Sequence, residues 1–305
     1  MAMKIVRSTS LRTMVSVAES IVVASGKGGV GKSMLASSLA MLFAQSKKIV
    51  AVDCDVDAPN LHLWLGEDEK WDEVKKISTN EKPVIDKTKC NLCGQCVDIC
   101  AFNALSIENS ELVVNNYFCE GCGACEEVCP RGAITMKPVE NAEIKIKKNV
   151  YGFPLVSAQL YPGESGSGKI VDYIKQKAEK FEHELMIIDS PAGIGCPVIA
   201  AVRDANLAIL VTEPTPSGLA DLRRVLSVVD YFKISYGVVI NKWDINRQMS
   251  KRIEREFAGR ILGKISYDQK VFIAIANLTP IMKTKLKAKD EMESIFAVIK
   301  ERGFS

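Results

Sequence analysis

A glycine-rich loop between an apolar strand and an apolar helix sets the strongest limit on how this chain folds. Within SGKGGVGKS, the residues Gly26, Gly31, Lys32 and Ser33 satisfy the pattern G-x-x-x-x-G-K-[ST]. The β-branched run before the loop, residues 20–25, predicts a buried strand, and the apolar periodicity after it predicts a helix over 33–45. In this strand–loop–helix context the pattern predicts a loop that holds phosphate groups.

The chemistry of such a loop follows from its backbone. N–H groups around the glycines point at phosphate oxygens, and the helix N-terminus adds partial positive charge. Lys32 is expected to meet the β- and γ-phosphates, and the Ser33 hydroxyl to hold Mg²⁺. The residues expected to bind nucleotide are Gly26, Gly28, Gly29, Val30, Gly31, Lys32, Ser33, Met34, Asn241 and Lys242.

Strand and helix signals alternate along most of the chain. This alternation predicts an α/β fold with a mostly parallel sheet and helices on both faces. Further strands are expected at 48–55, 185–189, 207–212 and 236–241, and helices near 197–204, 217–231 and 247–258.

Carboxylates stand at the ends of two predicted strands. Asp53, Asp55 and Asp57 follow the second strand, and Asp189 ends the run LMIID. Acidic side chains at the carboxyl edge of a sheet can orient water or magnesium, so we expect Asp53 and Asp189 to be catalytic. Asp55 is a weaker candidate, and Asp57 is as well explained as a helix cap.

Base recognition is expected from INKWD, residues 240–244, through Asn241, Lys242 and Asp244. The pattern N-K-x-D alone would indicate guanine, because an aspartate carboxylate accepts two N–H bonds from that base. These residues leave the choice between adenine and guanine open.

A second match, G-x-x-x-x-G-K, occurs at Gly163, Gly168 and Lys169. Here Ile170 replaces the hydroxyl that would hold the metal, and the preceding letters LYP do not resemble a buried strand. We expect a mobile loop that caps the site, structural or facing a partner, and not a second nucleotide site.

Eight of the ten cysteines fall in two runs of identical spacing, C-x2-C-x2-C-x3-C. In this pattern three thiolates hold one cubane and the fourth reaches the other. Zinc sites instead use paired C-x2-C knuckles that are farther apart, so zinc is the less favoured alternative. We expect two 4Fe–4S clusters, one on Cys90, Cys93, Cys96 and Cys129, the other on Cys119, Cys122, Cys125 and Cys100.

The cysteine-rich segment interrupts the α/β rhythm and differs in charge. Residues 90–136 hold six acidic side chains and one arginine, a net charge of −5, which leaves +8 for the rest of a chain whose total is +3. We therefore expect an inserted domain at 86–138, within a host domain formed by 1–85 and 139–305.

The motifs together resemble a known family. SGKGGVGKS carries an additional lysine, Lys27, as in the deviant Walker A loop of the MinD/Mrp/ParA-type P-loop ATPases, to which the nitrogenase iron protein also belongs. The resemblance implies ATP and a homodimer closed over two nucleotides, with Lys27 reaching the phosphates across the interface and Asp53 positioning water. The insertion is similar to bacterial two-cluster ferredoxins, although Ala101 stands where a proline follows the other fourth cysteine.

We therefore expect an ATPase that couples the nucleotide state of a dimer to electron transfer. A cluster carrier or assembly ATPase, and a positioning ATPase with a docking module, are the alternatives.

Cys54 and Cys196 are expected to be ordinary thiols, although a third cluster between subunits stays open. The chain is expected in the cytoplasm, and a redox partner protein stays an open alternative. The near-neutral charge and the absence of an 18-residue apolar run argue against nucleic acid and membrane. Residues 1–19 are expected to be an edge strand or a loose terminus.

Overall fold

A nine-stranded sheet organises the computed structural model, which describes residues 19–303. The strands lie in the order β13-β12-β11-β1-β10-β2-β9-β8-β3. The first seven of these are parallel to their neighbours, whereas β8 and β3 at the far edge are antiparallel. Their bounds are β1 Glu19–Ser25, β2 Ile49–Asp53, β3 Glu73–Ile77, β8 Ala142–Lys148, β9 Pro154–Leu160, β10 Leu185–Ala192, β11 Leu207–Thr212, β12 Ser235–Asn241 and β13 Ile261–Ile265.

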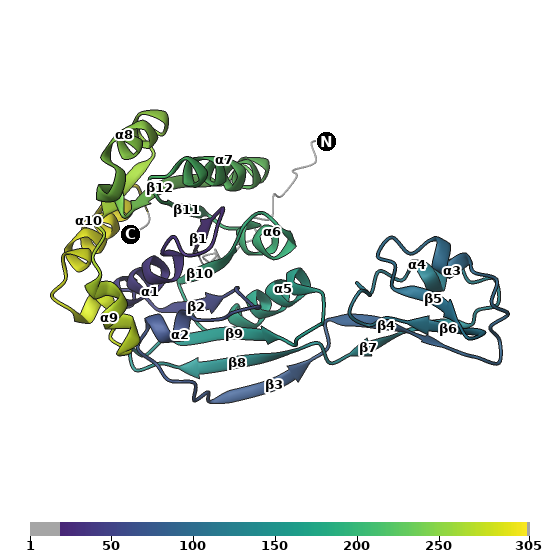
Figure 1. Cartoon of the computed structure of the whole chain (residues 1–305). Coiled ribbons are helices and arrows are strands. Elements are labelled where there is room, and N and C mark those ends of the chain that lie inside the picture. The colour runs from purple at the N-terminus through teal and green to yellow at the C-terminus, as the bar shows by residue number, and fades with distance from the viewer. Residues whose placement is uncertain (1–18, 304–305) are drawn as a thin grey trace, which may run out of the picture.

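Helices cover both faces of this sheet (Figure 1). The central strands are apolar on both faces because each face packs against a separate layer of buried side chains. One layer lies under α5 Ser167–Ala178, α6 Cys196–Val202, α7 Pro216–Tyr231 and α8 Arg247–Glu256. The other lies under α1 Lys32–Phe43, α2 Leu61–Trp64, α9 Lys270–Ala276 and α10 Lys287–Glu301.

The cysteine-rich segment forms its own small structure between β3 and β8. Ile77 at the end of β3 pairs with Ala142 at the start of β8, so the chain leaves and re-enters the large sheet at one point. Figure 1 shows the segment projecting from that edge. It consists of β4 Asn80–Ile85 paired with β7 Ile134–Val139, β5 Leu105–Glu108 paired with β6 Glu111–Val114, and the one-turn helices α3 Gln95–Asp98 and α4 Ala124–Glu127. We call residues 80–139 the cysteine module.

The strands and helices expected along the host domain are present, with ends shifted by a few residues. One expectation is wrong. The second glycine motif does follow a buried strand, β9, which ends at Leu160, and it opens the helix α5. The sequence of this strand, PLVSAQL, gives a weak strand signal because Val156 is its one β-branched residue. The expectation for residues 1–18 lies outside the described residues.

None of the helices described between residues 19 and 303 has the length and apolar character needed to cross a membrane.

Candidate functional site

Two glycines of the first loop are required by close contacts. A Cβ on Gly26 would lie 2.1 Å from the carbonyl oxygen of Asp221 in α7. Gly31, with φ of +96°, would place a Cβ 2.4 Å from Nδ2 of Asn241. Gly28 has open space at the same position. The loop is therefore fixed to α7 and β12 on one side and free on the other, as a cradle for a ligand requires.

A large pocket opens on the free side of the loop, with an empty volume of about 960 Å³. Its position at the carboxyl ends of β1, β2, β10 and β12 is where ligands bind in open α/β sheets. Eight of the ten residues expected to bind nucleotide line the pocket, and Gly26 and Val30 do not. The lining comes from Gly28, Gly29, Gly31, Lys32, Ser33, Met34, Asp55, Asn60, Trp64, Ala192, Asn241, Lys242, Ile265, Ser266, Tyr267, Asp268, Val271 and Phe272.

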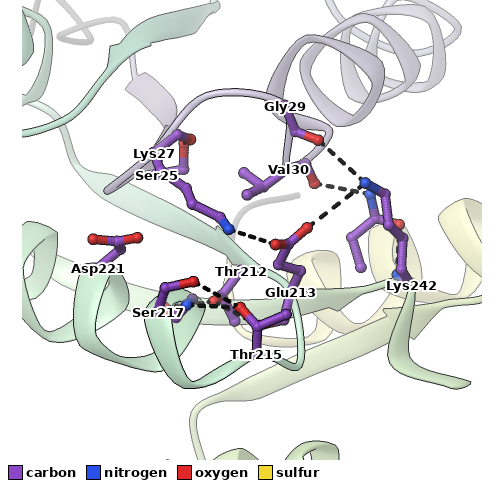
Figure 2. A network of polar contacts seen from close by, with 12 residues as sticks. Ser25, Lys27, Gly29, Val30, Thr212, Glu213, Thr215, Ser217, Asp221 and Lys242 are labelled. Carbon is purple, nitrogen blue, oxygen red and sulfur yellow. Dashed lines mark hydrogen bonds and ion pairs between the residues drawn. The ribbon is translucent and has the colours of Figure 1, made fainter. Parts of the chain in front are cut away.

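Lys27 does not line this pocket within its own chain. Its Nζ lies 2.5 Å from Oε1 of Glu213, in the segment that joins β11 to α7. Lys242 Nζ lies 3.6 Å from Oε2 of the same carboxylate and 3.4 Å from the Gly29 carbonyl (Figure 2). Glu213 is thus shared by two lysines beside the loop, and Lys27 must leave it to reach any phosphate.

The N-K-x-D stretch packs against the first glycine loop. Asn241 is buried and its Nδ2 donates to the Val30 carbonyl at 2.8 Å. The Asp244 carboxylate accepts the N–H of Tyr267 at 2.8 Å, and Asp244 does not line the pocket. A carboxylate used in this way is not directed at a base, so the geometry does not favour guanine.

Asp189 is suited to the metal side of the pocket. It is buried at the end of the apolar part of β10, and its Oδ1 has no hydrogen-bond partner within the described residues. Burial raises the pKa of this carboxyl, whereas the nearby charge of Lys32 and a hydrogen bond from Ser33 lower it. A buried carboxylate oxygen without a partner beside a serine hydroxyl fits the oxygen ligands that Mg²⁺ prefers.

Asp53 and Asp55 differ in where they point. The Asp53 carboxylate accepts the backbone N–H groups of Asp55 at 3.1 Å and of Asn60 and Leu61 at 2.9 Å, so it fixes the turn into α2. Burial and the charge of Asp189 raise its pKa. Asp55 instead lines the pocket. Burial raises the pKa of Asp55 and Lys32 lowers it. Asp57 is exposed, and the pocket lining does not include it.

The eight module cysteines lie around two separate hollows. Cys90, Cys93, Cys96 and Cys129 line the first, with an empty volume of about 350 Å³. Cys100, Cys119, Cys122 and Cys125 line the second, of about 340 Å³. These are the two sets of four that the spacing assigned to two clusters; that they bind iron stays a prediction. Within residues 19–303, no group of three or more His, Cys, Asp or Glu side chains was found that could hold a metal ion.

Local geometry around the hollows repeats in the two halves. Gly94 and Gly123, with φ of +80° and +78°, each precede a one-turn helix that carries a cysteine. The Ala104 and Ala133 N–H groups each donate to a cysteine sulfur at 3.3 Å, Cys100 and Cys129 respectively. N–H donors to sulfur are the contacts that tune iron–sulfur centres, so the residues present fit such a group.

The two remaining cysteines have different surroundings. Cys54 is fully buried beyond β2, and burial raises its pKa. Cys196 is exposed as the first residue of α6. Whether either joins a third cluster between subunits stays open.

Several residues of the site carry no signal in the sequence. Glu213, Trp64, Tyr267 and Phe272 belong to segments without a recognisable motif. Only Glu213 stood near a recognisable position, directly after the strand LAILVT.

The fold and the loop define a P-loop protein of the α/β class, with a nucleotide-sized pocket at the carboxyl edge of its sheet. Residues 21–281 match the family described as the CobQ/CobB/MinD/ParA nucleotide binding domain. The chain belongs to this family.

The chain is also similar to individual proteins and solved structures. The uncharacterized protein MJ0578 of Methanocaldococcus jannaschii is 39% identical over 281 residues, which cover 92% of this chain and 96% of the relative. Among solved structures, the cell division ATPase MinD of Pyrococcus furiosus aligns with a TM-score of 0.58 and 18% identity, over 94% of this chain and 100% of the other. MinD of Pyrococcus horikoshii, complexed with Mg-ADP, gives 0.57 and 18%, over 94% and 97%. At these identities the structures show a shared fold.

Proposed function

We propose that this chain is a dimeric ATPase in which the nucleotide state controls electron transfer through two 4Fe–4S clusters. One observation carries the proposal: a member of a nucleotide-binding family holds an additional module in which eight cysteines line two hollows, four around each. The module is an insertion between β3 and β8 of the nucleotide-binding domain, and its presence in the same chain points to a functional link.

The nucleotide half rests on the pocket residues. Backbone N–H groups of residues 28–33 bind the phosphates, and Lys32 neutralises their charge. Ser33 and Asp189 hold the Mg²⁺ that accompanies ATP, and the unpartnered Oδ1 of Asp189 supports this role. Asp55 lies on the pocket wall and is the better placed carboxylate for the attacking water. Asp53 accepts the backbone N–H of Asp55 and so fixes the turn that carries it.

Dimer closure depends on Lys27. Its ion pair with Glu213 keeps it within its own subunit in the isolated chain. In the dimer we expect Lys27 to exchange this carboxylate for a phosphate of the partner subunit's nucleotide. Glu213 then loses the positive charge of Lys27, and Lys242, which already faces the same carboxylate, partly replaces it.

The redox half rests on the two hollows. One set, Cys90, Cys93, Cys96 and Cys129, would hold one cluster, and Cys100, Cys119, Cys122 and Cys125 the other. A fully cysteine-ligated 4Fe–4S group supplies a one-electron carrier. The chain's own contribution is the orientation of the thiolates and the N–H donors to Cys100 and Cys129.

The deciding experiment is a redox titration of anaerobically purified protein without nucleotide, with ADP, and with a non-hydrolysable ATP analogue. Midpoint potentials that differ between the ADP and analogue forms support the proposal, and Lys32→Ala should remove the difference. Identical potentials in all three forms would rule out control by nucleotide. Rapid transfer of iron to an apo-acceptor would instead indicate a cluster carrier, and zinc without iron would remove the redox role altogether.

A further inference from the structure

The second glycine motif lies between the nucleotide domain and the cysteine module. We call residues 163–169, of which the last three form the first turn of α5, the linking loop. Ser165 Oγ donates to the Cys119 carbonyl at 3.2 Å and accepts from Asn80 Nδ2 at 2.9 Å. Asn141 Nδ2 donates to the Ser165 carbonyl at 3.0 Å. Both asparagines are buried, at 2% and 0% exposure, so Ser165 is held on a rigid base next to a cysteine of the second hollow.

A buried ion pair repeats this connection. Lys82 in β4 lies with its Nζ 3.2 Å from Oε2 of Glu164 in the linking loop, and it also donates to the Asn116 carbonyl. Lys82 is 5% exposed. At Gly163 an added Cβ would lie 2.2 Å from the Tyr117 ring. The loop therefore contacts the turn at residues 115–119 at several points, and this turn leads into the second set of cysteines.

The other end of the linking loop contacts the nucleotide side. The Cβ position of Gly168 lies 3.3 Å from Cβ of Cys196, the first residue of α6. Helix α6 begins seven residues after Asp189, directly beyond the segment that borders the pocket at Ala192. Helix α5 continues from the linking loop, and its Lys175 Nζ donates to the Ala200 and Arg203 carbonyls at 2.8 and 2.7 Å. These hydrogen bonds join the end of α6 to α5.

From these contacts we propose that the linking loop transmits the nucleotide state from the segment after Asp189 to the second hollow, with Ser165 as a positioning residue for Cys119. The inference rests on the proposed function and assigns its coupling between nucleotide and clusters to the linking loop. It also predicts that the second hollow responds to the nucleotide and the first does not. Within residues 19–303, no hydrogen bond or ion pair joins a residue that lines the first hollow to the nine-stranded domain.

Hydrogen exchange with mass spectrometry on the anaerobically purified chain tests this. Exchange is compared between ADP and a non-hydrolysable ATP analogue, for a peptide over 115–123 and a peptide over 88–98 at the first hollow. In the wild-type protein we expect the first peptide to respond to the nucleotide and the second to stay unchanged. Ser165→Ala should lose at least half of the response, and Ser165→Thr, which keeps the hydroxyl, should retain it.

Two further variants separate coupling from folding. Ser167→Ala is the matched control, because the Ser167 side chain makes no hydrogen bond among the described residues, and it should behave as wild type. Glu164→Gln tests the same connection should Ser165→Ala fail to fold. It keeps the shape of the loop, removes the charge that faces Lys82, and should reduce the response of the 115–123 peptide. A full wild-type response in both Ser165→Ala and Glu164→Gln would overturn the inference.

The same variants are titrated as in the redox experiment. Ser165→Ala should bring the ADP and analogue potentials of one cluster together while ATP binding persists. Identical potentials in the wild-type protein would overturn the proposed function. A wild-type difference that survives in Ser165→Ala and Glu164→Gln leaves that function standing and removes the linking loop from it.

Discussion

Replacing Glu213 by glutamine should tighten the ATP-bound dimer by about 30-fold. Glu213 accepts from Lys27 at 2.5 Å, and their side chains are 15% and 32% exposed. If Lys27 has to leave this carboxylate before it can reach a phosphate in the partner subunit, the ion pair opposes dimer formation. A glutamine keeps the shape and an acceptor oxygen but removes the charge.

The size of the effect follows from the hydrogen bond. A charge-assisted bond contributes about 1.5–3 kcal/mol, and a neutral one is roughly half as strong. The substitution therefore lowers the cost of releasing Lys27 by about 1 kcal/mol in each subunit. Because a dimer releases two lysines, the gain is about 2 kcal/mol, which corresponds to the 30-fold change in the dimer dissociation constant.

Sedimentation equilibrium in the presence of a non-hydrolysable ATP analogue measures this constant. Glu256→Gln is a suitable control, because Glu256 pairs with Arg223 at 2.7 Å on the outer surface of α7 and α8, in a pair unrelated to the pocket. A Glu213→Gln dimer that is no tighter than wild type, or weaker, would show that Lys27 does not have to be released.

Three other predictions concern the pocket and the module. Gly26→Ala should lower the free energy of unfolding by about 3 kcal/mol, because its Cβ would meet backbone, whereas Gly28→Ala should leave urea unfolding unchanged. Asp55→Asn should slow phosphate release about 100-fold while a fluorescent ATP analogue still binds. In nucleotide-free protein, the raised pKa of Asp53 means that the folded state holds its proton more tightly than the unfolded chain, so the free energy of unfolding falls as pH rises above about 4. Asp53→Asn should flatten that fall, as measured by urea unfolding at several pH values; an unchanged slope would contradict the argument.

Local patterns were sufficient to predict β1, β2, β10, β11 and β12 of the host domain, together with α1, α6, α7 and α8. The strand at 20–25, the glycine loop and the helix after it were predictable because strand burial, positive φ at Gly31 and the helix start are all properties of a few consecutive residues. The repeated spacing of the cysteines likewise predicted two groups of four, since the chain between them is short.

Local patterns did not predict strand β9 or the start of α5. Strand β9 has few β-branched residues, yet residues 155–158 are buried because β2 and β8 enclose them. Burial at such a position depends on neighbouring strands rather than on the segment itself.

Contacts between distant segments depended on the tertiary structure alone. The Lys27–Glu213 pair joins residues 186 positions apart, and the bond from Ser165 to Cys119 joins residues 46 apart. Which of Asp53 and Asp55 faces the pocket was decided by the turn into α2, whose N–H groups occupy the first carboxylate. Residue types and spacing define which groups are available, but only the packing of the strands and helices determines which of them meet, because side-chain partners are selected by distance in space.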